Sequence, residues 1–455
     1  MSAVRTIATH LAAWAGAVRL ADVPAEAVEI ACRCLLDVTG VALAGCRTES
    51  ARRIASLAAD TYAPGPCDVL GAAGRLTAAG AALANGAAAH ALDFDDNCYA
   101  GVVHGSATTF PAVLAAAQSA DASGESLLCG FIAGAEVQFA LGAALTPAFY
   151  ERGWWNTAVL GAIGAAAGGG RVMGLDGDRL TAAIALAAAG SGGIRAVRGS
   201  EGKHYLCGRA AEAGVSAAEL ARRGASAPAD VFEDRNGFLA TMNGALFEAG
   251  AIESIGERFG LLDPGVDIKR FPTCYASHAA ADAVADIVAA HGLGEADIAS
   301  VICEVPALVA SNLTFERPRT ANEAQFSMPF AIAGMIVFGD VGLDHLQAPA
   351  LLDRRLRSMM ERVEMQVTDR FDADVSRLRA GPECASVRVM TTSGEQIERF
   401  CPWALGSARR PLPREALESK FLACATRAVD MATAARWLGR IGAIENVERV
   451  RELFT

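Results

Sequence analysis

The densest group of residues that could do chemistry lies between His90 and His104. The sequence reads HALDFDDN at 90–97, and HGS follows at 104–106. On a helix, residues three apart share a face, so His90 and Asp93 would lie together. Such a cluster could bind Mg²⁺ or Mn²⁺, or it could be a metal-free acid–base site built on His104, since histidine changes charge near neutral pH. The alternative without chemistry is a helix C-terminus followed by a solvated acidic turn.

Basic residues gather in a second cluster, RAVRGSEGKHY at 195–205. Gly202-Lys203 suggests a phosphate-binding loop, but Val197 stands where that motif needs a glycine, and His204 follows the lysine in place of Ser or Thr. The segment is therefore a glycine-flanked basic loop before a helix. Its functional interpretation is the capture of a carboxylate, and its structural alternative is a surface loop with solvated charges.

A third cluster, KRFPTCYASH at 269–278, combines a basic pair, a proline turn and a histidine. It falls at the predicted junction of two domains, where small-molecule clefts often form. Cys274 beside two cations could be reactive, with a buried inert thiol as the alternative. Ser277 or His278 could instead cap the helix that follows.

The elements that must position these clusters are mostly helices. Apolar residues recur at three- and four-residue steps through the first two-thirds of the chain, as they do in amphipathic and buried helices. Gly161, Gly164 and Gly168 recur at helical steps, which predicts a close helix crossing. Alternating apolar and polar residues then predict strands at 298–305, 362–368, 386–392 and 396–400.

These patterns predict a mostly α protein with two domains. From 413 onward the sequence is helical again. We therefore expect a large all-helical domain formed by 1–264 and 406–455. A smaller α/β lid domain is expected as an insertion at 265–405.

The composition excludes several classes of protein. The chain has 455 residues, of which 52% are hydrophobic and 20% charged, and its net charge is −11. It must therefore bury a core, and it offers no basic face to nucleic acid or to an anionic membrane. No secretory signal is expected, and no apolar stretch is expected to span a membrane. Twelve cysteines without a CxxC pair predict reduced thiols in a cytoplasmic protein, with neither a disulfide framework nor a zinc site.

Taken together, these segments resemble the MmgE/PrpD family, whose members include 2-methylcitrate dehydratase, cis-aconitate decarboxylase and iminodisuccinate epimerase. The similar motifs, in chain order, are HALDFDD (90–96), HGS (104–106), GWWNTAVLGAIGAAA (153–167), Lys203 before GRAA (208–211), KRFPTCYASHAAADA (269–283) and FSMPFAIA (326–333). The resemblance implies a large helical domain with an α/β lid, a homodimer, and no cofactor; we assign no metal ligand.

The resemblance also implies roles for single residues. Asp93, His104, Lys203 and Lys269 match positions that line the family's active site. Asp93, His104 and Lys203 are the catalytic candidates, with His104 as base or acid oriented by Asp93. Lys203 and Lys269 would hold substrate carboxylates and stabilise an enolate-like intermediate.

Several pocket positions depart from the family's residues. Trp155 stands where members typically have histidine, and Phe330 replaces a tyrosine that could act as an acid. Asn97 replaces a threonine of the decarboxylase, and Leu206 replaces a common histidine. Cys274 stands where the decarboxylase has histidine, although other members also have cysteine there. The substrate-binding candidates besides Lys269 are Asn97, Trp155, Cys274, Tyr275, His278 and Phe330.

The expected function is a cofactor-independent lyase, similar to 2-methylcitrate dehydratase, that removes a proton next to a carboxylate of a small polycarboxylate. The alternative is an epimerase or isomerase of a dicarboxylate, similar to iminodisuccinate epimerase, which needs no acid for a leaving group. A binding homologue without activity and a metal-dependent hydrolase on His90, Asp93 and Asp96 are further alternatives. The expected partners are the polycarboxylate and a second copy of the chain, with no nucleic acid and no membrane.

Overall fold

The computed structural model describes residues 6–371 and 383–455, and the chain divides into two compact units. The first unit contains residues 1–91, 95–266 and 413–455, and the second contains 92–94 and 267–412. The range expected for the smaller domain, 265–405, includes 372–382, which lie outside the described residues. Residues 92–94 belong to the second unit through contacts distant in sequence, which a linear boundary does not reveal.

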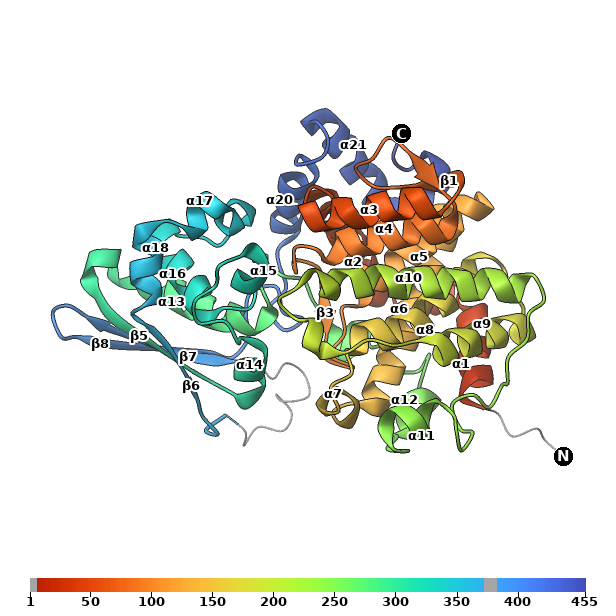
Figure 1. Ribbon diagram of the computed structural model, residues 1–455, viewed down its shortest axis with the longest axis horizontal. Helices are drawn as coiled ribbons and strands as arrows, with labels where there is room; N and C mark the ends of the chain where they lie inside the picture. Colours follow the sequence, from red (N-terminus) through yellow and green to blue (C-terminus); the bar gives the residue numbers. More distant parts are fainter. Residues whose placement is uncertain (1–5, 372–382) are drawn as a thin grey trace. The chain divides into compact units, whose positions relative to one another are not determined.

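The first unit is mostly helical (Figure 1). Its helices are α1 (Ile7–Ala17), α2 (Ala25–Gly45), α3 (Glu49–Thr61), α4 (Ala78–His90), α5 (Gly105–Ala120), α6 (Gly124–Leu145), α7 (Ala148–Glu151), α8 (Asn156–Val172), α9 (Gly177–Gly190), α10 (Glu201–Arg222), α11 (Phe238–Asn243), α12 (Ala249–Glu253), α20 (Arg414–Ala425) and α21 (Met431–Ile441). The strands β3 (Asn97–Cys98) and β4 (Val266–Asp267) have two residues each.

The expectation of an all-helical domain is wrong at the short strand β3 and at a hairpin of the first unit. The strands β1 (Pro64–Asp68) and β2 (Arg75–Leu76) pair antiparallel, with Asp68 opposite Arg75. The first strand reads PGPCD, and proline and glycine weaken the strand signal in a sequence. The alternation that revealed the later strands is therefore missing here.

The close helix crossing predicted from the glycine series is confirmed between α6 and α8. A Cβ atom on Gly164 would lie 2.5 Å from the carbonyl oxygen of Gly134, and one on Gly168 would lie 2.5 Å from that of Gly130. No side chain fits at such distances, so only glycine lets these backbones meet.

The candidate residues of the first unit are positioned by three helices that pack together. Helix α10 packs against both α4 and α8. His90 is the last residue of α4, Trp155 directly precedes α8, and Lys203 lies in the first turn of α10. The helix packing therefore brings the histidine and basic clusters into one unit.

Helix α6 is long and apolar enough to span a membrane by length and composition, contrary to the expectation that no stretch would qualify. It runs for 22 residues, and 89% of its most apolar window is buried inside the structure. Such burial is typical of a helix that is apolar all round and lies in a protein core.

The second unit contains a four-stranded sheet in the order β6-β5-β7-β8. The strands are β5 (Ile298–Val305), β6 (Val363–Val367), β7 (Ala385–Thr391) and β8 (Gln396–Cys401), as the alternation predicts. The β5–β6 pair is parallel and the other two pairs are antiparallel. The helices are α13 (His278–His291), α14 (Ala307–Asn312), α15 (Ala321–Ala324), α16 (Met328–Phe338), α17 (Ala348–Leu351) and α18 (Arg354–Met360). Helices α13 and α16 pack against each other and against strands of the sheet.

Candidate active site

The first unit brings His90, Asp95 and His104 together. Helix α4 ends at His90 and α5 begins directly after His104. The loop between them folds back onto the C-terminal end of α4. His90 Nδ1 lies 2.9 Å from Asp95 Oδ1 and 2.8 Å from Oδ2. His104 Nδ1 lies 3.3 Å from Asp95 Oδ2, and the two imidazole centroids are 4.5 Å apart. One carboxylate is thus shared by two imidazoles.

Burial separates the roles of these three groups. The Asp95 side chain is fully buried, whereas the His104 side chain is 16% exposed. Burial lowers the pKa of His90 to about 3, so this imidazole is neutral at pH 7. Burial by itself disfavours the Asp95 carboxylate, but the neighbouring His90 and His104 outweigh it and hold the pKa of Asp95 well below its usual range. Asp95 is therefore ionised and only accepts hydrogen bonds.

Asp96 fixes the loop that carries His104. Its carboxylate accepts hydrogen bonds from the Ser106 backbone N–H at 3.2 Å and from the Ser106 hydroxyl. Its backbone carbonyl lies 2.9 Å from His104 Nδ1. The backbone N–H of His104 donates to Thr157 Oγ1 of α8 at 3.0 Å. His104 is therefore fixed through both its ring and its backbone.

Lys203 adds a positive charge beside this cluster. Its ammonium nitrogen lies 5.5 Å from the centroid of the Trp155 ring, and that ring lies 5.4 Å from the His90 ring. Burial is the largest cause of the lowered pKa of His90, and the charge of Lys203 lowers this pKa further. Lys203 is half-buried, while Trp155 and Asn97 are buried. A half-buried ammonium beside the group of rings that contains a partly exposed imidazole can bind a carboxylate in the same region as a proton acceptor.

In the second unit, Asp93 and Lys269 form a buried ion pair. The lysine Nζ donates to Asp93 Oδ2 at 3.0 Å and to the Asp93 carbonyl oxygen at 2.7 Å. Lys269 is fully buried and Asp93 is 2% exposed. Asp93 has a φ of +48°, in the left-handed region that aspartate tolerates better than most residues.

Within the first unit, the carboxylate that faces His104 Nδ1 is that of Asp95, and the predicted role of Asp93 toward His104 stays a prediction. Spacing on a helix would have put Asp93 on the face of His90, but α4 ends at His90. The chain then turns through the left-handed Asp93, and the carboxylate beside the two imidazoles is that of Asp95. Asp95 follows His90 by five residues, and no glycine or proline between them signals the turn.

The other candidates of the second unit lie in buried surroundings. The His278 ring centroid is 4.8 Å from that of Tyr275. His278 and Phe330 are fully buried, and burial raises the pKa of Tyr275 well above its usual range. Cys274 is half-buried. The predicted residues thus form two groups: Asn97, His104, Trp155 and Lys203 in the first unit, and Asp93, Lys269, Cys274, Tyr275, His278 and Phe330 in the second.

Among the described residues, His90, Asp95 and His104 form a group that could hold a metal ion, with one ligand atom from each within 4.8 Å of the others. Two imidazoles and one carboxylate would suit a transition metal. The 2.8 Å and 2.9 Å contacts between His90 and Asp95 are, however, ordinary hydrogen-bond distances, and the charge of Lys203 disfavours a cation. The expected hydrolase set is not supported, since the Asp93 carboxylate binds Lys269 and that of Asp96 binds Ser106.

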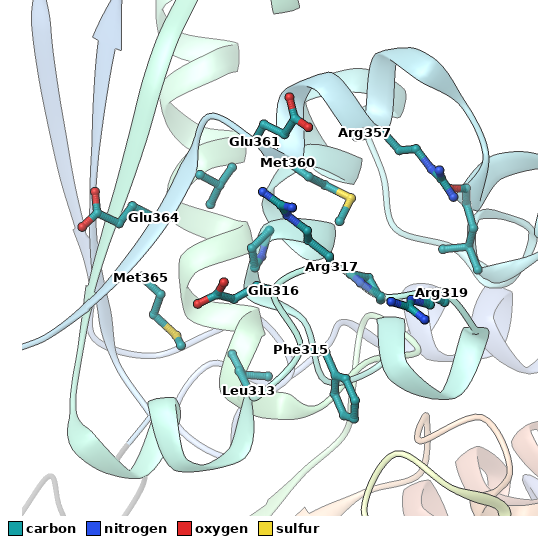
Figure 2. Close-up of a pocket in the computed structure, with 14 residues that line it drawn as sticks. Leu313, Phe315, Glu316, Arg317, Arg319, Arg357, Met360, Glu361, Glu364 and Met365 are labelled. Atoms are coloured by element: carbon teal, nitrogen blue, oxygen red, sulfur yellow. The ribbon is translucent and has the colours of Figure 1, made fainter.

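A pocket of about 530 Å³ lies in the second unit (Figure 2). Arg317, Arg319 and Arg357 line it together with Glu316, Glu361 and Glu364, so the formal charges cancel. Among the described residues that line this pocket, none is a predicted site residue. A polycarboxylate needs a surplus of positive charge, which this pocket does not provide.

The chain is similar to known proteins along most of its length. The MmgE/PrpD N-terminal domain matches residues 9–248, and the MmgE/PrpD C-terminal domain matches residues 271–441. The human cis-aconitate decarboxylase is 27% identical over 445 residues, which cover 93% of this chain and 88% of that protein. The cis-aconitate decarboxylase of Aspergillus terreus is 25% identical over 453 residues, which cover 93% of this chain and 90% of that protein. These relatives support an enzyme of the lyase type, and the two domain matches show that the chain belongs to the MmgE/PrpD family.

Proposed function

We propose that this protein is a cofactor-independent lyase that acts on a small polycarboxylate by moving a proton at a carbon next to a carboxylate. The observation that carries the proposal is the partly exposed His104, whose Nδ1 faces the Asp96 carbonyl and the Asp95 carboxylate. The other ring nitrogen, Nε2, is then the proton acceptor. Lys203, near the same group of rings, supplies the charge that binds a substrate carboxylate.

The first candidate reaction is dehydration, as in 2-methylcitrate dehydratase. His104 Nε2 takes a proton from the carbon next to a carboxylate, and the electron pair of that C–H bond forms the carbon–carbon double bond. The C–O bond breaks, and the imidazolium returns the proton to the leaving hydroxyl, which departs as water. Lys203 stabilises the negative charge that develops on the carboxylate. Asp93 is proposed to orient Lys269, which remains a predicted carboxylate ligand.

The second candidate is decarboxylation, which the names of the relatives favour. We place it second because Asn97 and Cys274 differ from the residues of the decarboxylase, and because Phe330 replaces a tyrosine that could act as an acid. Epimerisation of a dicarboxylate, which uses the same proton abstraction, is the alternative outside the lyases. All three reactions require His104 to carry a proton.

The test is proton NMR in D₂O with purified protein, EDTA, and a panel of 2-methylcitrate, citrate, cis-aconitate, malate and iminodisuccinate. A vinyl product formed with loss of water would support dehydration, and one formed with loss of CO₂ would support decarboxylation. Loss of an α-proton signal without a new carbon skeleton would support the epimerase. A reaction seen without EDTA but abolished by it would contradict cofactor independence.

The family resemblance supports a homodimer, and the reduced thiols support a location in the cytoplasm. We further propose that the second unit acts as the lid that the resemblance implies.

A further inference from the structure

We propose that Asp95, which is hydrogen-bonded to His90, is a positioning residue for His104. It holds His104 in the Nδ1–H tautomer, so that Nε2 can take the proton. The inference rests on the proposed function for the role of His104. It goes beyond that function, because it assigns the tautomer of the base to Asp95 and His90, for which the sequence predicted no part in orienting His104.

The tautomer follows from the groups that face His104 Nδ1. The Asp96 carbonyl oxygen, 2.9 Å away, can only accept a hydrogen bond. The Asp95 carboxylate oxygen, 3.3 Å away, also only accepts. An unprotonated Nδ1 would place its lone pair against two acceptor oxygens. Nδ1 therefore carries the hydrogen, and in the neutral ring Nε2 carries the lone pair.

His90 holds Asp95 in place from the other side. Its Nδ1 lies within hydrogen-bond distance of both carboxylate oxygens, at 2.8 and 2.9 Å. Because the His90 imidazole is neutral, this contact requires the hydrogen on Nδ1. The side chains of both residues have no exposed surface, so bulk water cannot replace the bond. Asp95 is therefore held to both histidines.

The charge of Asp95 also acts during the reaction. When His104 takes a proton it becomes an imidazolium, and the Asp95 carboxylate lies 3.3 Å from its Nδ1. An opposite charge at this distance in a buried setting stabilises the protonated ring. An amide in the same place supplies no charge. Its NH₂ group would also face an N–H group of one of the two histidines, and two donors cannot form a hydrogen bond.

The variant that tests the inference is Asp95→Asn, measured for kcat, for KM and for the His104 tautomer. We expect kcat to fall by about 10²-fold or more, with KM changed less than about threefold because Lys203 still binds the substrate. In ¹⁵N NMR, with the His104 signals identified by their loss in His104→Gln, the wild type should show Nδ1–H and the variant a mixture of tautomers. A wild-type kcat in Asp95→Asn, or an Nε2–H tautomer in the wild type, would overturn the proposal.

Three further variants separate positioning from folding. His90→Asn keeps an N–H donor for Asp95 and should retain about a tenth or more of kcat, whereas His90→Leu removes the donor and should resemble Asp95→Asn. Glu136→Gln also changes a buried carboxylate of the first unit to an amide, and it should leave kcat and the His104 tautomer unchanged. Equal activity of His90→Leu and wild type would contradict the proposal.

The NMR measurement keeps this inference distinct from the proposed function. If the wild type shows no lyase activity, the function fails, but the tautomer in wild type and Asp95→Asn still tests the positioning role. If His104→Gln keeps full activity, His104 is not the base, and the proposed function fails whatever the tautomer is.

Discussion

At the scale of single residues, the neighbours of His104 fit the role of a base that we propose for it. The Asp95 carboxylate and the Asp96 carbonyl face Nδ1 of the His104 ring, and the side chain is 16% exposed. His90 shares the same carboxylate but is buried and neutral, so it supports the cluster without titrating near pH 7. Two histidines fourteen residues apart in sequence thus have different roles because their burial differs.

His104→Gln should lower kcat by about 10²–10⁴-fold, the range typical of a lost general base. Glutamine keeps a polar side chain of similar reach but cannot take the proton. Steady-state kinetics on the best substrate of the panel is the measurement, and a circular dichroism spectrum checks the fold. His291→Gln, an exposed position at the end of α13, is the matched control and should keep wild-type activity. Loss of activity in both variants alike would contradict a specific role for His104.

The sequence was sufficient to select His104 and Lys203 by residue type and resemblance, and the structure places both in one unit. Asp95 could not be selected by spacing, because five residues separate it from His90 and a continuous helix would turn it away. Only the end of α4 at His90 brings it back. The relevant signal lay in a turn without glycine or proline, which sequence patterns detect poorly.

At the scale of elements, glycine sets how closely α6 and α8 approach. It thereby supports the helix on which Thr157 lies and which Trp155 directly precedes. The predicted crossing and the four later strands are confirmed, because their signals repeat over many residues. The β1–β2 hairpin was missed because a Gly/Pro-rich strand has no alternating pattern. Sequence patterns that repeat over many residues therefore predict helices and strands reliably, whereas short irregular segments do not.

Gly164→Ala should destabilise the protein by about 1–3 kcal/mol, since its Cβ would lie 2.5 Å from a backbone oxygen of α6. Gly439→Ala, inside α21, has no atom within 4 Å of the new Cβ and should stabilise by about 0.5–1 kcal/mol. Thermal unfolding midpoints of the two variants measure the difference. Equal midpoints would contradict the account of the crossing.

Glu136 of α6 predicts a pH dependence of stability. Its carboxylate accepts the backbone N–H groups of Gly260 at 2.7 Å and Leu261 at 2.9 Å, while burial raises its pKa from 4.5 to about 7. Between these two values the folded state holds a proton that the unfolded state releases. The contribution of this group to stability is therefore full below pH 4.5 and is lost as the pH rises toward 7.

The glutamine of Glu136→Gln cannot titrate. The loss in the free energy of unfolding, relative to the wild type, should therefore be smaller at pH 8 than at pH 5, by up to about 3 kcal/mol. Denaturant unfolding of both proteins at the two pH values measures this difference. A cost that does not change with pH would show that Glu136 titrates alike in the folded and unfolded states.

At the scale of the whole molecule, two compact units share one chain whose net charge is −11. A polycarboxylate would be repelled by that overall charge, so local cations such as Lys203 must offset it. The division of the chain near 265 and 410 follows from the change between helical and alternating patterns. The inclusion of 92–94 in the second unit could not be predicted, because it depends on the Asp93–Lys269 pair between segments 176 residues apart.

A homodimer predicts a mass of twice 46.9 kDa in solution. Size-exclusion chromatography with light scattering at micromolar concentration measures it directly. A single species at 46.9 kDa would contradict the homodimer.

The central claim is that His104 moves a proton at a carbon next to a carboxylate. The most direct measurement follows deuterium from D₂O into substrate and product by NMR, with wild type and His104→Gln side by side and EDTA present. The account predicts deuterium at that carbon with the wild type, and exchange at least 10²-fold slower with the variant. Exchange at the wild-type rate in His104→Gln would contradict it.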